Sequence, residues 1–591
     1  MSWFSNLAQT YDRVAEIAGI SNDGNVLLPS NHMLAKSDIC VVIDAQGNFR
    51  RADESELRIC IPCTEDSASR AGKAIFPHPL HDQMGYLTLD EGKFEAYIEQ
   101  LGSWSNYHPK VKAIYDYIMQ RTLPENLENC GIKGDDPKKF IRFHVETSDG
   151  PENKLWEDKG IVEAWQAYCQ SLQPTESEIC YATGIIAACT AKHPKGINAS
   201  AYGAKLISSN DSANYTYRGR FTKPEQANSI SASASHKAHA MLKYLVSTYG
   251  LKCDTQAIVA WAIDDGSPQV DIFDNSMDIF EKTARSGADM LIEAGGELDI
   301  NYAKKLRGAL LGMGDAKKLH GHSRMIAVMA MDAATTGRMG ITFYQSLPQN
   351  EFLERVISWH EDCSWWFVGK DSKAYVSAPA TDRIIAVVFG ERKGEGYQKI
   401  KKQARERLLS HIICGEPLSR GWIAAAVNHV SRPQAFDNAL DWEDALSATC
   451  AIVRKYFLQK KEEIGLALDT NNKDRSYLFG RLLALADSIE FHARGKSDTQ
   501  KRPTNATRYM TAFAAKPMRT WTLIFGQLNP YIQKLDGATW FQNQIDEVMD
   551  LFEGEEYDDK PLSGKYLLGY SLQRRALMGR DKKEGNENES N

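Results

Sequence analysis

Residues 477–489, YLFGRLLALADSI, decide what the C-terminal part of the chain becomes. Their large apolar side chains recur at the spacing of one face of an α-helix, at Tyr477, Leu478, Leu482, Leu485 and Ile489. Further amphipathic segments follow at roughly 504–516, 519–534, 540–552 and 563–576. The sequence therefore predicts an all-helical bundle over residues 461–591.

Upstream of this bundle the pattern mixes strands with helices. Apolar runs predict a strand at 38–43 before a turn at 44–47, a half-buried strand at 140–145 and a buried strand at 256–262. Helices are expected at 109–121, 160–172 and 232–248, with a short apolar helix after residue 180 and helices throughout after about residue 395. Residues 374–379 and 383–389 fit either a strand or the start of a buried helix.

These patterns predict an α+β fold, with a mixed α/β N-terminal and middle body and an all-helical C-terminal bundle. We expect four regions: an N-terminal α/β region (1–130), a middle α+β region with a basic loop (131–345), a helix-rich connecting region (346–460) and the bundle (461–591). A chain of 591 residues, 43% of them hydrophobic, is long enough to bury several cores without disulfides.

Composition also indicates a compartment. The 11 cysteines are scattered among apolar neighbours, which is typical of buried thiols in a reducing environment. The opening residues, MSWFSNLAQTYDRVAEIAG, contain acids and polar side chains and do not resemble a secretory signal. No apolar run reaches the roughly 18 residues that a membrane span needs. We expect a cytoplasmic protein.

The charge is unevenly distributed. The formal net charge of -7 argues against a free-standing nucleic-acid binder. Residues 193–221, HPKGINASAYGAKLISSNDSANYTYRGRF, nevertheless carry four Lys or Arg residues against the single acid Asp211. Further basic clusters lie at 304–324, 392–407 and 494–519. Any one cluster is compatible with a solvated surface, but together they favour a long polyanion as the partner.

Enzyme motifs are weak. Cys60-Ile61-Pro62-Cys63 with His78 and His81 lacks the ligand spacing of a zinc site, and His320-Gly321-His322 has no nearby carboxylate. The WHEDCSW stretch (359–365) places His360 and Cys363 in different directions on a helix, which fits a buried core better than a catalytic dyad. The chain has no phosphate-binding, dinucleotide-binding or nucleophile-elbow motif. We expect no catalytic residue, metal or cofactor, and keep a metal-dependent nuclease using Asp264, Asp265 and the nearby histidines as an alternative.

A set of short motifs occurs in a fixed order over most of the chain. They are CYATG (180–184), HPKGI (193–197), LISSN (206–210), TGRM (336–339), WHEDCSW (359–365), FGRLLA (479–484), and LGY with QR (568–574). In this order they resemble the large subunit of the type I-C CRISPR interference complex, Cascade. One departure is Ser209, which stands where that family has a phenylalanine in its S-F-N motif.

The resemblance implies a non-catalytic subunit of an RNA-guided antiviral ribonucleoprotein complex. In such complexes a CRISPR RNA, held by backbone and RNA-processing subunits, pairs with one strand of the target DNA. The large subunit recognises the protospacer-adjacent motif on double-stranded DNA, promotes R-loop formation, holds the displaced strand and helps to recruit the helicase-nuclease. Small subunits complete the assembly. Base pairing with the CRISPR RNA then recognises the long target sequence, while the large subunit recognises the short protospacer-adjacent motif.

The resemblance also implies roles for residues. In the basic loop, Lys195, Lys205 and Arg218 are expected on phosphates, while polar and aromatic side chains lie near base edges or stack on bases: Ser208, Ser209, Asn210, Asn214, Tyr215 and Tyr217. The displaced strand is expected to follow a second basic surface made of Arg494, Lys496, Lys501, Arg502 and Arg508. The alternatives are an ordinary polar surface loop and a scaffold subunit that never contacts bases.

Overall fold

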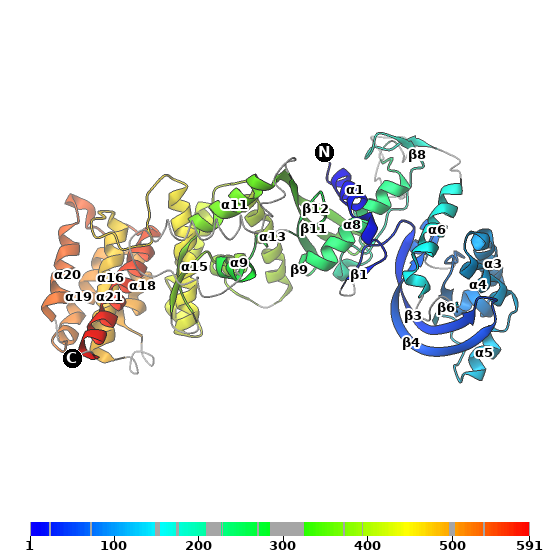
Figure 1. Ribbon diagram of the computed structural model, residues 1–591. Helices are drawn as coiled ribbons and strands as arrows, with labels where there is room; N and C mark the ends of the chain where they lie inside the picture. Colours follow the sequence, from blue (N-terminus) through cyan, green and yellow to red (C-terminus); the bar gives the residue numbers. More distant parts are fainter. Residues whose placement is uncertain are drawn as a thin grey trace. The chain divides into compact units, whose positions relative to one another are not determined.

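The computed structural model describes residues 2–22, 25–70, 74–147, 154–172, 177–208, 226, 228–268, 271–283, 324–369, 373–392, 394–495, 503–535 and 538–589. Two compact units are present: unit 1 is Met1–Gln269 with Arg324–Ser346, and unit 2 is Val270–Ser323 with Leu347–Asn591. Helix accounts for 52% and strand for 18%, in several small sheets among many helices, so the α+β class is confirmed (Figure 1). The four finer regions stay a prediction.

The first sheet of unit 1 has the strand order β4-β3-β6-β5. A long antiparallel hairpin of β3 (His32–Asp44) and β4 (Phe49–Pro62) confirms the strand and turn predicted at 38–47. β6 (Phe140–Glu146) runs parallel to β3 and pairs with β5 (Asp82–Gln83). The helices α3 (Glu91–Trp104), α4 (Pro109–Met119), α5 (Leu123–Asn129) and α6 (Lys159–Ser171) contribute side chains to the core on this sheet.

The prediction that β6 is half-buried is wrong. Its alternating polar residues are buried too, Arg142 at 5% and His144 at 8% exposure. β6 lies between two other strands, and Arg142 donates from Nη1 to Ser37 Oγ at 2.7 Å. In the sequence, a buried polar side chain that has a hydrogen-bond partner therefore gives the same alternating pattern as a polar side chain on the solvent-facing side of a strand.

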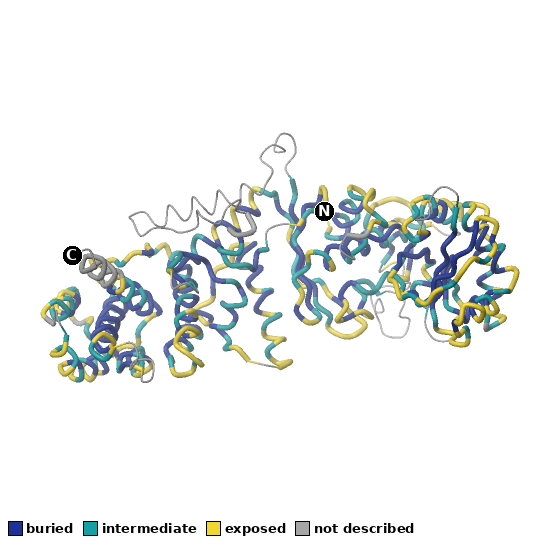
Figure 2. Tube along the Cα trace, turned by 60° about the horizontal axis from the view of Figure 1, so that its bottom comes forward, coloured by how far each residue is buried: buried dark blue, intermediate teal, exposed yellow. Residues whose placement is uncertain are grey.

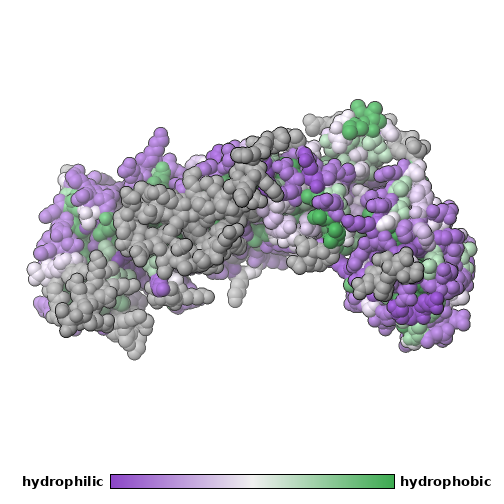
Figure 3. All heavy atoms as spheres, viewed as in Figure 1, coloured by the Kyte–Doolittle hydropathy of each residue, from purple (hydrophilic) through white to green (hydrophobic). Residues whose placement is uncertain are grey.

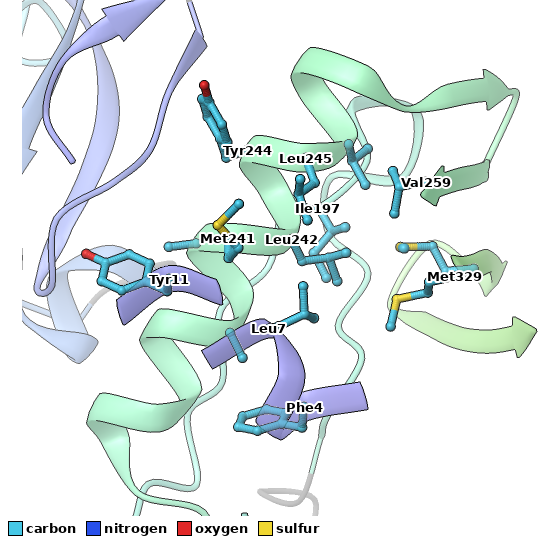
Figure 4. Close-up of a cluster of buried hydrophobic side chains, with 14 of the residues drawn as sticks. Phe4, Leu7, Tyr11, Ile197, Met241, Leu242, Tyr244, Leu245, Val259 and Met329 are labelled. Carbon is cyan, nitrogen blue, oxygen red and sulfur yellow. The ribbon is translucent and has the colours of Figure 1, made fainter. Parts of the chain in front are cut away.

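The second sheet of unit 1 has the order β12-β11-β10-β9. It is formed by β9 (Leu251–Cys253), β10 (Gln256–Ala262), β11 (Met325–Thr335) and β12 (Arg338–Pro348). Helices α1 (Trp3–Arg13) and α8 (Ala232–Tyr249) share its core. Figure 4 shows Leu7, Met241 and Val259 among the buried side chains that join helices and strands.

The short apolar helix predicted after residue 180 is wrong. This segment is a hairpin of β7 (Glu178–Ile179) and β8 (Ile186–Ala187), which turns at Gly184 with a φ of 72°. Ile179 and Ile186 are 59% and 69% exposed. Apolar side chains gather in Figure 3 at the place where Figure 1 labels β8. A run of apolar residues predicts a helix here, but Ile179, Ile185 and Ile186 are exposed.

Unit 2 is mainly helical. Its first part contains α9 (Ser276–Thr283), α11 (Gln349–Asp362), the strand pair β13 (Trp365–Val368) and β14 (Ala374–Ser377), α12 (Thr381–Phe389), α13 (Glu395–Ile413), α14 (Arg420–Val430) and α15 (Ala439–Leu458). The open choice at 374–389 resolves as a strand followed by a helix. The rest is α16 (Arg475–Arg494), α18 (Asn505–Ala515), α19 (Pro517–Ile532), α20 (Ala538–Asp550) and α21 (Lys565–Glu589), which confirms the predicted helical end.

Helix α16 is buried on every side. Every residue from Ser476 to Glu490 is buried, so the apolar face predicted for 477–489 is only one part of the contact surface (Figure 2). Gly480 and Gly569 let α16 and α21 approach closely, because a Cβ on Gly480 would lie 2.0 Å from the Tyr566 carbonyl oxygen and one on Gly569 would lie 2.2 Å from that of Tyr477. The FGRLLA and LGY motifs therefore meet at this helix crossing.

Polar contacts fix the same crossing. Arg481 donates from Nε to Gln573 Oε1 at 3.0 Å, and Tyr570 donates its hydroxyl to Asp487 Oδ2 at 2.7 Å. Buried hydrogen bonds of this kind favour one helix register over its neighbours. Among the helices that the structure describes, none has the length and apolar character to cross a membrane.

Candidate nucleic-acid interface

His193, the first residue of the basic segment, is hydrogen-bonded to helix α8 and to Asn228. Its Nε2 accepts a hydrogen bond from Asn228 Nδ2 at 2.7 Å, and its Nδ1 therefore donates to Ser235 Oγ at 2.8 Å. Burial lowers the pKa of His193 to about 4, so the ring is neutral at pH 7 and can make both bonds. One imidazole thus connects the start of the segment to α8 and to Asn228, which follows the segment in the sequence.

Gly196 sets the path of the chain after His193. Its φ is 79°, and a Cβ there would lie 2.9 Å from the Tyr202 ring. Both features favour glycine at this position. Asn198 then accepts a hydrogen bond from the Ser200 backbone at 3.0 Å and donates to the Asp254 carbonyl at 3.3 Å, which anchors the segment beside β9.

The segment next runs along the turn between β11 and β12. The Lys205 amide donates to the Gly337 carbonyl at 3.2 Å, and the Met339 amide donates to the Lys205 carbonyl at 3.0 Å. The TGRM motif (336–339) therefore lies against the segment that joins HPKGI to LISSN. Motifs far apart in sequence meet here, at the base of the predicted reading loop.

The lysines at this base are close enough to repel one another. Burial, followed by the charges of Lys195 and Lys192, lowers the pKa of Lys205. Lys192 forms an ion pair with Asp66, whereas Lys195 and Lys205 have no carboxylate partner in the described residues. The local field is thus positive at this surface, which attracts anionic ligands.

The structure locates only some of the residues predicted to contact duplex DNA. Lys195, Lys205 and Ser208 are half-buried at the base of the segment. The others, Ser209, Asn210, Asn214, Tyr215, Tyr217 and Arg218, lie outside the described residues. Sequence reasoning missed His193 as an anchor. Its place at the start of HPKGI was the available signal, but its two hydrogen-bond partners are evident only in the structure.

The second predicted surface belongs to unit 2. Arg508 on α18 is exposed, whereas the Arg494 side chain is only 9% exposed and pairs with Glu490 at 2.9 Å. Contact between Arg494 and a displaced strand would therefore require that ion pair to open. Lys496, Lys501 and Arg502 lie outside the described residues.

The residues considered for metal chemistry have other contacts. Asp265 accepts a hydrogen bond from the Ser267 backbone at 3.0 Å and pairs with Arg324, while the 320–322 histidines lie outside the described residues. His81 Nδ1 accepts from the Phe143 amide at 3.1 Å, and burial raises the pKa of the Cys60 thiol to about 12. Within the described ranges, no three His, Cys, Asp or Glu side chains are placed to hold one metal ion.

The WHEDCSW motif (359–365) has a structural role. His360 is buried and its Nδ1 lies 2.8 Å from Ser276 Oγ, while burial raises the pKa of the Cys363 thiol to about 12. A thiol with a raised pKa is a poor nucleophile at pH 7. The stretch is thus part of the core of unit 2, as the sequence predicts.

Comparison with known proteins agrees with the ordered motifs. No curated protein matches the chain. The family model of the CRISPR-associated protein Cas_Csd1 matches residues 7–578. This match includes both units and every motif named above, so the chain belongs to the CRISPR-associated Cas_Csd1 family.

Proposed function

We propose that this protein is the large subunit of a type I-C Cascade complex. In this role it is non-catalytic, recognises the protospacer-adjacent motif on double-stranded DNA, promotes R-loop formation, holds the displaced strand and helps to recruit the helicase-nuclease. Its partners are the CRISPR RNA and the backbone, RNA-processing and small subunits of the complex. Membership of the Cas_Csd1 family supports a role in a Cas complex.

The observation that carries the DNA-binding part is the base of the basic segment. Lys195 and Lys205 lie at a positive surface without carboxylate partners among the described residues, and His193 fixes the segment that follows. Lysines in such a setting neutralise backbone phosphates and release counterions. Ser208 is half-buried three residues after Lys205, and we propose that it and the polar residues that follow it in the sequence contact the duplex.

The test is a binding titration of the reconstituted RNA-guided complex at one stated salt concentration. Two target duplexes differ only in the motif beside the target. We expect the complex with this chain to prefer the motif-bearing duplex, and we expect alanine at Ser208, Ser209 and Asn210 together to reduce that preference roughly tenfold or more, since one good base contact discriminates by about 1–3 kcal/mol.

Substitution of Arg508 by alanine is the matched control, because it removes a charge from unit 2 without changing the basic segment. This substitution should weaken the binding of both duplexes similarly and leave the ratio of their affinities unchanged. Equal binding of the two duplexes, with and without this chain, would contradict motif reading and favour a scaffold subunit. Divalent-metal-dependent DNA cleavage that alanine at Asp264 and Asp265 abolishes would instead favour a nuclease.

A further inference from the structure

An exposed apolar surface lies on the hairpin of β7 and β8. Ile179, Ile185 and Ile186 are each more than half exposed, as is Tyr181. Ile179 and Ile186 are opposite each other in the antiparallel pair, so their side chains lie next to each other on one face. Single exposed apolar residues are normal on a protein surface, but contiguous ones mark interaction sites. The outer face of the hairpin thus has the character of a docking surface.

The inner side of the hairpin is fixed to the core of unit 1. Cys180 is buried in that core, and its Sγ accepts a hydrogen bond from the Ser231 amide at 3.2 Å. Ser5 on α1 donates its hydroxyl to the Ala182 carbonyl at 3.1 Å. A two-stranded hairpin is only marginally stable on its own, so these contacts hold the exposed face in one shape. Binding to a preorganised surface of this kind costs little conformational entropy.

The charges along the hairpin indicate the kind of partner. Residues 177–191 contain no Lys or Arg, and their single acid, Glu178, accepts a hydrogen bond from Ser229 Oγ at 3.0 Å. The next cation in the sequence, Lys192, pairs with Asp66. Nucleic acids and anionic lipid surfaces are bound largely through Lys and Arg, which the hairpin lacks. An apolar protein surface has the matching chemistry.

The size of the apolar face indicates what kind of protein contact it makes. A stable interface uses about 20–30 residues on each partner, and the hairpin exposes only four large apolar ones. A second copy of this chain, held by the hairpin alone, would therefore dissociate. Four such residues are sufficient as the apolar centre of a larger contact with a polar rim. This arrangement fits a subunit that a multi-subunit complex also holds at other places.

We propose that the hairpin of β7 and β8 docks this chain onto an apolar surface of another protein subunit of the RNA-guided complex. This inference rests on the proposed function, because it requires the chain to be a subunit of that complex, and it adds the surface that the chain uses. The isoleucines leave water on docking, and their burial stabilises the assembly. Assembly then depends on the hairpin, whereas recognition of the motif depends on the basic segment.

The test uses the full chain with Ile179→Thr and Ile186→Thr together. Threonine keeps the β-branched shape that suits a strand and makes the face polar. The melting midpoint of the chain alone should stay the same, since changes at exposed sites usually have little effect on stability. The affinity for the CRISPR RNA bound to the backbone and RNA-processing subunits, titrated without target DNA, should fall by roughly tenfold or more.

Leu440→Thr is the matched control, because it changes an exposed apolar residue at the start of α15 in unit 2. This control should leave both the melting midpoint and the affinity unchanged. The inference is overturned if the double variant of the hairpin assembles with wild-type affinity. A lower melting midpoint of the double variant alone would overturn it too, because the chain itself would then cover the two isoleucines.

Two further results would assign the hairpin to another partner. If light scattering shows that the wild-type chain is a dimer and the double variant a monomer, a second copy covers the hairpin and the inference is wrong. If the double variant assembles normally but its complex binds target duplex more weakly, the hairpin contacts nucleic acid and the inference is wrong as well.

Failure of the proposed function gives a different result. If the double variant does not assemble and the wild-type complex shows no preference for the motif-bearing duplex, motif reading is wrong and the docking surface stands. If the double variant assembles and keeps the motif preference, the proposed function stands and only the docking surface is wrong. A wild-type chain that does not join the other subunits contradicts both.

Discussion

Alanine at Gly480 is expected to unfold the C-terminal helices of unit 2 at a much lower temperature than in the wild type. The added Cβ would lie 2.0 Å from the Tyr566 carbonyl oxygen, and that atom is backbone within α21. Relief requires the two helices to separate, which also breaks the Arg481–Gln573 and Tyr570–Asp487 hydrogen bonds. The expected loss is about 3 kcal/mol, at the upper end of what overpacking a core usually costs.

Gly526→Ala is the control with the opposite sign. Gly526 lies inside α19, is exposed, and a Cβ there meets nothing within 4 Å. Alanine at this site should stabilise the helix by up to about 1 kcal/mol. Calorimetry, with limited proteolysis to assign each transition to a unit, measures both variants. If Gly480→Ala and Gly526→Ala melt at the same temperature, the close helix crossing is wrong.

Gly569→Ala should destabilise the helices as Gly480→Ala does. The losses of stability in the two variants should not add in the double variant, because both changes disturb the same contact between α16 and α21.

The second large expected effect is the unfolding of unit 1 in mild acid. Burial lowers the pKa of six of its histidines to about 3 or about 4: His32, His78, His81, His193, His236 and His239. In the unfolded chain they titrate near 6.5. The unfolded state therefore binds more protons below pH 6.5, and stability is complete above this value and falls as the pH drops.

The size of this effect follows from the number of histidines. At pH 5 each contributes about 2 kcal/mol in favour of unfolding. Six such groups together oppose the fold by roughly 12 kcal/mol, which is comparable to the whole stability of a domain. We expect unit 1 to unfold near pH 5, while unit 2, where in the described part only His360 has a pKa as low, persists to lower pH.

Hydrogen exchange measured by mass spectrometry from pH 7 to pH 4 separates the two units. The double change His236→Gln and His239→Gln should move the acid midpoint of unit 1 to lower pH, because two of the titrating groups are gone. Simultaneous unfolding of both units, or an unchanged midpoint in the double variant, would contradict the role of the buried histidines.

The sequence predicted elements well where one periodicity dominated. The strands at 38–43 and 256–262, the helices at 109–121 and 232–248, and the helical end all form as expected. It failed where tertiary contacts changed the meaning of a pattern. The alternation in β6 reflects Arg142 with buried partners, and the apolar run around Ile186 is an exposed hairpin. The spacing of residues along the chain shows neither the buried partners of Arg142 nor the exposure of Ile186.

The candidate site was predicted in part for the same reason. Charge and polarity identify the segment 193–221 from the sequence, since they are local. His193 was missed, because its importance comes from Asn228 and Ser235, which pair with it only after folding. Arg494 shows the converse: it belongs to a basic cluster in sequence, yet Glu490 one helical turn away neutralises it.

The bonds of His193 have a consequence for the evolution of the protein. The imidazole of His193, at the start of the segment, is hydrogen-bonded both to Ser235 on α8 and to Asn228. The entropy of closing a loop grows only slowly with length, by about 0.6 kcal/mol for each doubling. A change in the number of residues between His193 and Asn228 should therefore cost the fold little. Under the proposed function, selection can change the residues that contact DNA while His193 and its two hydrogen bonds stay the same.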